Sequence, residues 1–228
     1  MKAYFNGVRK NITDKMSELY LNPEKTAIVT IDMCMGHLSE APEAPCPAPR
    51  ARQIVEPINS FTSTCRKLGI PVINVRSTLR ADGSDDINGN ISAWRLTFPM
   101  TTGSIPGIDQ HAIEESQWCD FGIDVQDNDY IVSGKKRLSA FYTTDLELLI
   151  RNLRKEVIVL TGAMTDCCVL NTAFDGANRD FRVIVPRDLC RGFEDMEESA
   201  LRIISLYLGL VLDSDELVTE WETSTGRN

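Results

Sequence analysis

The amino-acid sequence predicts an α/β fold in three layers, with a doubly wound, mainly parallel sheet of about six strands and helices on both faces. Two observations support this prediction. Short runs rich in Val and Ile, apolar on both sides, recur along the chain and end abruptly in polar or turn residues, which is typical of buried parallel strands. Amphipathic segments lie between these runs, and strands that alternate with helices form βαβ units with right-handed crossovers.

The strands are expected at five apolar runs, with a shorter sixth run as an edge strand. The five runs are residues 26–31, 71–75, 129–133, 156–161 and 182–185, and the expected edge strand is 208–212. Helices are expected where apolar residues recur every three or four positions. These segments are 50–68, 144–153, 169–179 and 194–207. The second of them opens with Thr144 and Glu147, which have the spacing of a capping box.

Two segments interrupt this alternation and are expected to form loops. Residues 37–49 contain four prolines and predict a loop or an extended lid. Residues 77–125 are polar and contain Gly and Pro, so long loops around a weak helix near 109–117 are expected. Long loops in a compact domain are often functional. A length of 228 residues without a repeat or a linker predicts one domain over 1–228, with 1–23 as an N-terminal extension.

The composition and charge of the chain argue against several classes of function. The formal net charge is -9 and the pI is about 4.8, which argues against nucleic acid or anionic membranes as partners. The apolar runs are far shorter than the roughly 18 or more residues of a membrane span, and the N-terminal segment lacks the apolar core of a signal peptide. Seven irregularly spaced cysteines fit a reducing compartment better than a disulfide framework. A cytoplasmic chain is therefore expected.

The ends of the predicted strands carry the candidate chemistry. In open α/β sheets, ligands bind outside the carboxyl ends of the strands. This rule selects Asp32, Arg76, Lys135, the 162–168 turn and Asp188. A carboxylate, an ammonium group and a thiol are thus expected on one rim of the sheet.

Cys168 is the candidate nucleophile of this rim. It lies in the turn between a buried strand and a helix, so it is expected near the N-terminus of that helix. The exposed N–H groups and the positive end of the helix dipole would lower the pKa of its thiol from about 8.5 and favour the thiolate. The same N–H groups would stabilise an oxyanion during acyl transfer.

Three motifs, in order and spacing, resemble those of the isochorismatase-like cysteine hydrolase family, and the resemblance covers about residues 24–221. The first is an apolar strand that ends in Asp32. The second is Lys135-x-x-x-Ser-Ala-Phe followed by Thr-Asp-Leu at 144–146. The third is Gly-x-x-Thr-x-x-Cys-Val at 162–169, followed by Thr-Ala at 172–173 and an Asp at 175. The layout is most similar to the N-carbamoylsarcosine amidohydrolase branch.

The resemblance implies hydrolysis of an amide C–N bond through a thioester, with release of ammonia and without a cofactor. Asp32 would accept the proton of the Cys168 thiol, and Lys135 would lie between the two and lower both pKa values. The backbone N–H groups of Met164 and Cys168 would form the oxyanion hole. The family also carries a non-proline cis peptide bond in this turn, which here would join Ala163 and Met164.

Other residues of the sequence compete for these roles. Cys167 occupies a variable position of the motif and is expected to pack, and Lys136 is expected at the surface. A Cys–His pair would require His37 or His111, and both histidines lie in expected loops. Relatives that act on nicotinamide bind a metal through histidines that residues 80–86 lack, so no metal is expected. Proper isochorismatases cleave a vinyl ether and lack the cysteine, so Cys168 favours amide or ureide hydrolysis.

The substrate is expected to be a small carboxamide, an N-carbamoyl compound or a ureide. His37 is a candidate pocket or lid residue. Trp94 and Phe98 would wall the pocket, or would be core or interface aromatics. Arg191 would bind a substrate carboxylate or form a surface ion pair. The resemblance and the aromatic content predict a homodimer or homotetramer in which loops 36–50 and 90–122 help to wall the pocket. The competing hypothesis is a non-catalytic binding or assembly protein that reuses the fold.

Overall fold

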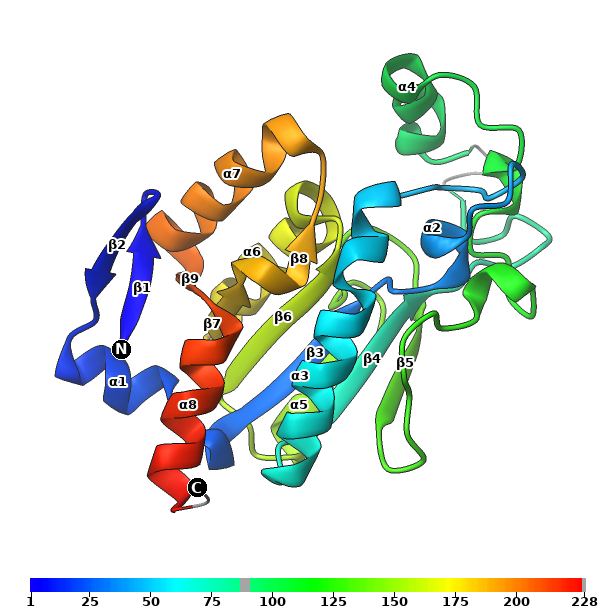
Figure 1. The fold of residues 1–228 in the computed structure, drawn as a ribbon. Coiled ribbons are helices and arrows are strands. Elements are labelled where there is room, and N and C mark those ends of the chain that lie inside the picture. The colour runs from blue at the N-terminus through cyan, green and yellow to red at the C-terminus, as the bar shows by residue number, and fades with distance from the viewer. Residues whose placement is uncertain (87–90, 227–228) are drawn as a thin grey trace.

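The computed structural model describes residues 1–86 and 91–226, and its centre is a sheet of nine strands (Figure 1). Eight of the strands run in the order β2-β1-β9-β7-β6-β3-β4-β5, and β8 also pairs with β6. The six expected runs correspond to β3 (Thr26–Ile31), β4 (Val72–Ser77), β5 (Tyr130–Lys135), β6 (Val157–Ala163), β7 (Arg182–Pro186) and β9 (Gly209–Leu212), which pair in parallel. The predicted fold class is confirmed, but the predicted number of strands was too low.

The three additional strands have sequences without a buried-strand pattern. β1 (Lys2–Phe5) and β2 (Val8–Asn11) form an antiparallel hairpin, and β1 pairs with β9, so the expected edge strand lies inside the sheet. All four residues of β2 are exposed, which explains why they lack an apolar run. β8 (Cys190–Arg191) has only two residues. The N-terminal extension is therefore an integral part of the sheet.

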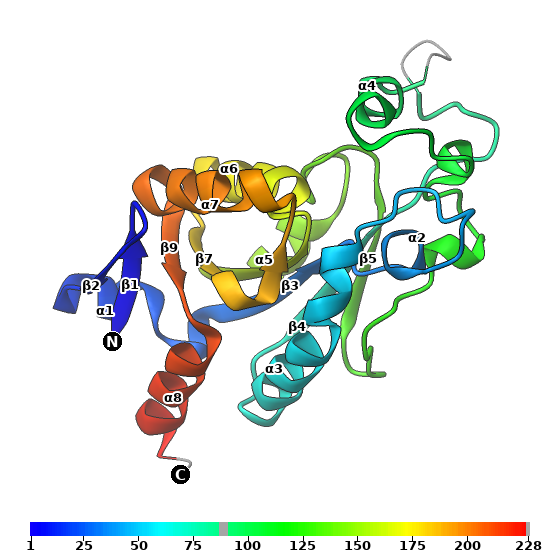
Figure 2. The same ribbon diagram turned by 45° about the horizontal axis from the view of Figure 1, so that its top comes forward.

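Helices cover both faces of the sheet (Figure 2). One apolar cluster joins one face to α3 (Val55–Lys67) and α8 (Ser214–Thr225), with Ile58 and Trp221 fully buried in it. A second cluster joins the other face to α5 (Leu146–Asn152), α6 (Leu170–Asn178) and α7 (Glu194–Ile203). Because alternate strand residues face opposite layers, the Val- and Ile-rich runs fill both clusters at once.

The ends of several helices differ from the prediction. The expected capping box does not form, because α5 begins at Leu146 and Thr144 Oγ1 accepts from the Leu146 N–H while it donates to the carbonyl of Ala140. Glu147 instead pairs with Arg151 and Arg179. Short non-α turns extend the other helices. They are the 3₁₀ turn Pro49–Ile54 before α3, the π-helical turn Thr165–Val169 before α6 and the π-helical turn Ile204–Leu208 after α7.

The long loops contain more helix than expected. Residues 109–117 form only the edges of two 3₁₀ turns, Ile108–Gln110 and Gln117–Cys119, whereas α4 (Ala93–Thr102) was not expected. Its Pro99 and its threonines obscured the helical pattern. α4 stands apart from the sheet at one end of the molecule (Figures 1 and 2). A short helix, α2 (Met35–Leu38), overlaps the start of the proline-rich loop. Another short helix, α1 (Asp14–Tyr20), follows the N-terminal hairpin.

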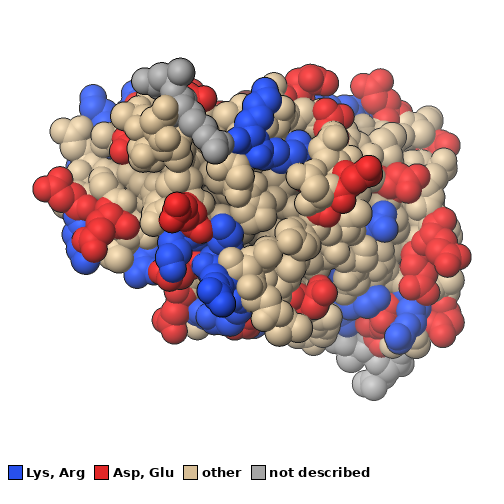
Figure 3. Space-filling view, turned by 90° about the horizontal axis from the view of Figure 1, so that it is seen from below, with Lys and Arg blue, Asp and Glu red and all other residues tan. Residues whose placement is uncertain are grey.

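The surface is charged in both signs. Acidic and basic side chains lie interspersed over the face in Figure 3. Within residues 1–86 and 91–226, none of the helices is both long and apolar enough to span a membrane.

Candidate active site

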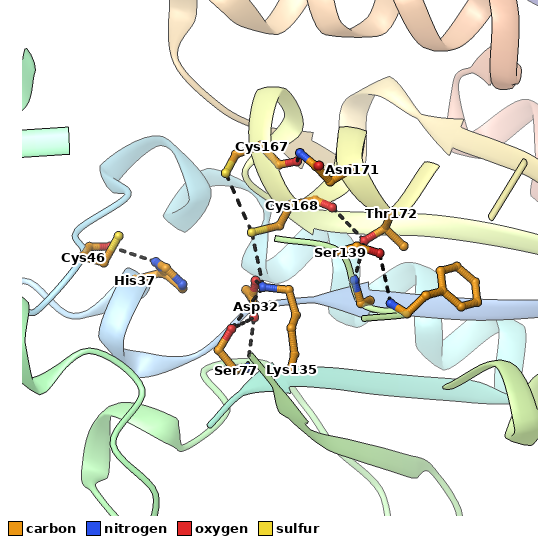
Figure 4. A network of polar contacts seen from close by, with 12 residues as sticks. Asp32, His37, Cys46, Ser77, Lys135, Ser139, Cys167, Cys168, Asn171 and Thr172 are labelled. Atoms are coloured by element: carbon orange, nitrogen blue, oxygen red, sulfur yellow. Dashed lines mark hydrogen bonds and ion pairs between the residues drawn. The ribbon is translucent and has the colours of Figure 1, made fainter. Parts of the chain in front are cut away.

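Four polar side chains meet at the carboxyl ends of neighbouring strands (Figure 4). Asp32 follows β3, Ser77 ends β4 and Lys135 ends β5. Cys168 lies in the π-helical turn after β6. Asp32 adopts a left-handed conformation with φ of 53°, which turns the chain sharply at the end of the central strand. This rim is the place where an open α/β sheet binds ligands.

The three residues expected to form a catalytic set are in contact. Nζ of Lys135 lies 2.6 Å from Oδ2 of Asp32 and 3.4 Å from Sγ of Cys168. Asp32 and Lys135 are each only 2% exposed. Lys135 therefore lies between the carboxylate and the thiol, as the resemblance implied.

Asp32 and Lys135 hold each other in their charged forms. Burial alone would raise the pKa of Asp32, but the charge and the hydrogen bond of Lys135 outweigh it and lower that pKa below the usual value. Burial opposes the charged form of Lys135, and the Asp32 carboxylate more than offsets it, so the pKa of Lys135 is raised. Near neutral pH the site thus contains a carboxylate that is available as a base.

Cys168 differs from the expectation of a preformed thiolate. Its hydrogen bond with Cys167 and its burial raise the pKa of the Cys168 thiol, against the opposing charge of Lys135. Burial in a low-dielectric site disfavours the charged thiolate, and the Lys135 ammonium offsets only part of this effect. A hydrogen bond between the Cys168 thiol and Asp32 contributes to the lowered pKa of Asp32. This direction favours the neutral thiol of Cys168 over the thiolate.

Ser77 is a site residue that the sequence analysis missed. Its backbone N–H and its Oγ–H donate to Oδ1 of Asp32, at 3.1 Å and 3.0 Å, and its Oγ accepts from Lys135 at 3.1 Å. The strand-end rule had selected the preceding residue, Arg76. Arg76 instead donates to Ser133 and to the Cys119 carbonyl, because adjacent strand residues point to opposite faces.

Replacing Ser77 with alanine is expected to lower kcat by roughly 10- to 100-fold, because Asp32 loses a hydrogen bond to a charged group worth about 1.5–3 kcal/mol. The measurement is steady-state kinetics on the best substrate, with the pH profile of kcat recorded for both proteins. Ser133→Ala is the matched control, because Ser133 contacts Arg76 on the same strand ends but lies outside the Asp32 network. Equal kinetics for Ser77→Ala and the native chain would contradict the positioning role.

A glycine allows the 162–168 turn, which carries Cys168, to approach β3, the strand that leads to Asp32. Gly162 has φ of 113°, and a Cβ atom there would clash with the carbonyl oxygen of Ile31, next to Asp32. The Ala163–Met164 peptide bond that follows is cis, as the resemblance implied. The carbonyl of Met164 accepts from the N–H groups of Cys167 and Val169. These bonds fix the first turn around Cys168.

Thr172 connects the second and third motifs. Its Oγ1 donates to the carbonyl of Cys168 at 2.7 Å and accepts from the N–H of Ala140 at 3.0 Å (Figure 4). Ser139 Oγ in turn accepts from the N–H of Phe141. The segment after Lys135 and the helix after Cys168 are thus held together behind the reactive groups.

The reactive groups form one wall of a cavity of about 340 Å³. The expected residues His37, Trp94 and Phe98 line it, and His111 lies beside them. Their rings are in contact. The centroid separations are 6.2 Å for Trp94 and Phe98, 4.7 Å for Trp94 and His111, and 5.4 Å for His37 and His111. The lining of the cavity therefore combines the reactive groups with a cluster of aromatic rings.

Arg191 is not brought to this site. Its Nη1 donates to the carbonyls of Arg187 and Cys190, and Arg191 is not among the described residues that line the cavity. The structure therefore does not support the expectation that Arg191 binds a substrate carboxylate. The cations nearest to the cavity, apart from Lys135, are Lys136 and Arg137, and Lys136 pairs with Asp85 at 3.0 Å.

The fold and the geometry of this rim define a hydrolase of the α/β class with a cysteine, a lysine and an aspartate in contact. The model of the isochorismatase domain matches residues 26–216, so the chain belongs to the isochorismatase family. This confirms the resemblance inferred from the three motifs.

Individual relatives agree with the family assignment. The chain is 26% identical to an N-carbamoylsarcosine amidase from Arthrobacter over 72% of its length, and 27% identical to a ureidoacrylate amidohydrolase from Methylorubrum extorquens over 70%. It spans 58% and 66% of the length of these two relatives. A solved isochorismatase-like hydrolase from Alkaliphilus metalliredigens superimposes with a TM-score of 0.72 and 26% identity, over 87% of this chain and all of that one.

Proposed function

We propose that the protein is a cysteine amidohydrolase that cleaves the C–N bond of a small carboxamide, N-carbamoyl or ureide substrate through a thioester and releases ammonia. The observation that carries this proposal is the contact of Lys135 with both Asp32 and Cys168 at the wall of the cavity. The names of the two curated relatives support the carbamoyl and ureide classes.

In the first half of the reaction, the thiol adds to the substrate carbonyl. The Cys168 proton passes to Asp32 as the S–C bond forms, and the carbonyl oxygen gains the negative charge. The backbone N–H groups of Met164 and Cys168 are the proposed donors to this oxyanion. Asp32 then returns the proton to the departing nitrogen, the C–N bond breaks, and ammonia leaves the acyl group on Cys168 as a thioester.

In the second half, water releases the acid product. Asp32 takes a proton from the water molecule, and the hydroxide adds to the thioester carbonyl. The C–S bond breaks, and the sulfur recovers the proton from Asp32. The Lys135 charge remains beside both groups throughout, so it stabilises each anion as it forms.

The cavity favours a substrate with a flat or apolar body behind its amide. Trp94, Phe98, Leu79 and Leu138 contribute apolar side chains to the lining of the cavity. Burial lowers the pKa of His37 and of His111, so both rings are neutral near pH 7 and offer hydrogen bonds without charge. A neutral carbamoyl or ureido group therefore suits the inner part of the cavity.

The expected result of a substrate panel is ammonia release from one class and little from the others. The panel contains aromatic carboxamides, N-carbamoyl amino acids and biuret-like ureides, and ammonia is measured with a coupled assay. Each compound is also incubated with Cys168→Ala as the blank. The amidohydrolase proposal fails if the protein binds a member of the panel but releases no ammonia above that blank from any of them. That result would support the alternative of a non-catalytic binding protein.

We also propose one domain over 1–228 that assembles in the cytoplasm as a homodimer or homotetramer. Leu96 and Met100 of α4 are 58% and 86% exposed, and α4 belongs to the loop region that walls the cavity. A second copy that packs on α4 would cover these side chains and complete the wall. Light scattering is expected to give a multiple of 25.5 kDa for the active sample. A monomeric mass at full activity would contradict this prediction.

A further inference from the structure

The cavity holds a second cluster of reactive side chains, separate from the Asp32 network. It consists of His37, Cys46 and His111, whose potential ligand atoms all lie within 4.8 Å of one another. His37 belongs to α2, Cys46 to the proline-rich loop, and His111 follows the 3₁₀ turn Ile108–Gln110. The mechanism above gives Cys46 no role, and it uses the two histidines only as uncharged hydrogen-bonding groups of the cavity lining.

The hydrogen bonds around this cluster leave ring nitrogens without protein partners. Nδ1 of His37 lies 2.8 Å from the carbonyl oxygen of Cys46. A carbonyl only accepts, so Nδ1 carries the proton, and the lone pair of Nε2 accepts no hydrogen bond from the residues that the structure describes. Metal-binding histidines are usually oriented in this way by a carbonyl or carboxylate. Nδ1 of His111 is buried and has no hydrogen-bond partner within the described part of the chain.

The loop that carries Cys46 is fixed relative to His37. The N–H of Cys46 donates to the carbonyl of Gly36, and the N–H of Ala48 donates to the carbonyl of His37, at 3.2 Å and 2.9 Å. Arg52 donates to the carbonyls of Leu38 and Ser39. The backbone therefore places the thiol beside the imidazole before any ligand binds.

We propose that His37, Cys46 and His111 form a binding site for a borderline-soft divalent transition-metal ion of the Zn²⁺ type, with a fourth coordination position open to the active-site cavity. Two imidazoles and a thiolate suit such an ion, whereas Mg²⁺ and Ca²⁺ require oxygen ligands. Three protein ligands and one open position are also the usual arrangement of a catalytic zinc site.

The dimensions of the cluster fit this ion. Zn–N bonds of about 2.0–2.1 Å and Zn–S bonds of about 2.3 Å in a tetrahedron separate the ligand atoms by roughly 3.3–3.7 Å. Spacings of up to 4.8 Å therefore close through side-chain rotations of about an ångström. Burial keeps both imidazoles unprotonated near neutral pH and raises the pKa of Cys46 to about 12. The ion displaces the thiol proton to solvent, so binding of one ion releases one proton.

All three proposed ligands line the same cavity as Asp32 and Cys168. An ion held there would present its open position to the space that the substrate occupies. A carbonyl, carboxylate or water oxygen in the cavity would fill that position. The site would thus anchor the part of the substrate that points away from the sulfur.

The test uses Co²⁺, which reports a bound thiolate by its absorption. The full chain is freed of metal with a chelator, dialysed, and titrated with Co²⁺ under reducing conditions. The expected result is one thiolate-to-cobalt charge-transfer band that saturates at one ion per chain and disappears when Zn²⁺ is added. Cys46→Ala is expected to lose the band, and His111→Asn to weaken Co²⁺ binding by at least about 10-fold.

Matched controls distinguish this site from the catalytic thiols. Cys167→Ala and Cys168→Ala are expected to keep the band, and Cys65→Ala controls for removal of a buried thiol distant from the cavity. A band that persists in Cys46→Ala and vanishes in Cys168→Ala would overturn the proposal, as would no band in the native chain. Circular dichroism identifies any variant that fails to fold. None of these measurements requires turnover, so they stand apart from the test of the amidohydrolase function.

Discussion

Replacing Cys168 with alanine is expected to lower kcat by a factor on the order of 10⁵ to 10⁶, because the thioester cannot form without the sulfur. Ammonia release measures the loss, and mass spectrometry of a quenched reaction is expected to show an acyl adduct on the native chain only. The fold should persist, because the change removes one sulfur atom and Thr172 still holds the backbone carbonyl at 168.

The adjacent cysteine is the natural control for this substitution. Cys167 also lines the cavity and contacts Cys168, with 4.0 Å between the two sulfur atoms. Cys167→Ala is expected to retain the adduct and most of the activity. If Cys167→Ala were inactive while Cys168→Ala turned over normally, the roles assigned to the two sulfur atoms would be reversed.

Replacing Asp32 with asparagine is expected to abolish turnover and also to destabilise the protein. The variant loses the general base and leaves the Lys135 ammonium buried without its counterion, which costs about 3–5 kcal/mol of the free energy of unfolding. For a chain of this size, that corresponds to a fall of roughly 6–20 °C in Tm. Calorimetry and ammonia release are measured on the same preparation.

The double variant Asp32→Asn, Lys135→Met separates catalysis from stability. Removing both charges eliminates the unpaired ammonium, so most of the lost Tm is expected to return while turnover stays absent. Arg66→Met is a control for loss of a buried charge elsewhere, because Arg66 pairs with Asp129 at 2.7 Å, away from the cavity. Substantial activity in the double variant would contradict the role of Asp32 as base.

Asp32, Lys135 and Cys168 were predictable from the sequence because the strand-end rule selected the rim and the three family motifs singled out these residues within it. Asp32 and Lys135 stand at the carboxyl ends of strands, and Cys168 lies in a turn with its own motif. Neighbouring parallel strands end at the same edge of a sheet, so their proximity follows from the topology. Ser77 was missed because a shift of one residue along a strand reverses the face on which a side chain points.

The remaining features depend on contacts that a one-dimensional pattern does not contain. The meeting of Cys46 with His111 requires two long loops to fold against each other. The Arg191 side chain is held by nearby carbonyls, which the strand-end rule cannot foresee. The N-terminal hairpin was missed because exposed strands have no need of an apolar period.

The N-terminal hairpin determines which strand forms this edge of the sheet and is open to contact with other molecules. Without it, β9 would be the last strand of the sheet, and its apolar sequence Gly-Leu-Val-Leu would present unpaired backbone groups to any other extended chain. With it, the outermost strand is β2, where Arg9 and Lys10 are exposed. Charged outer strands are a common defence against edge-to-edge aggregation. The short N-terminal hairpin thus replaces an apolar outer strand with a charged one at this edge of the sheet.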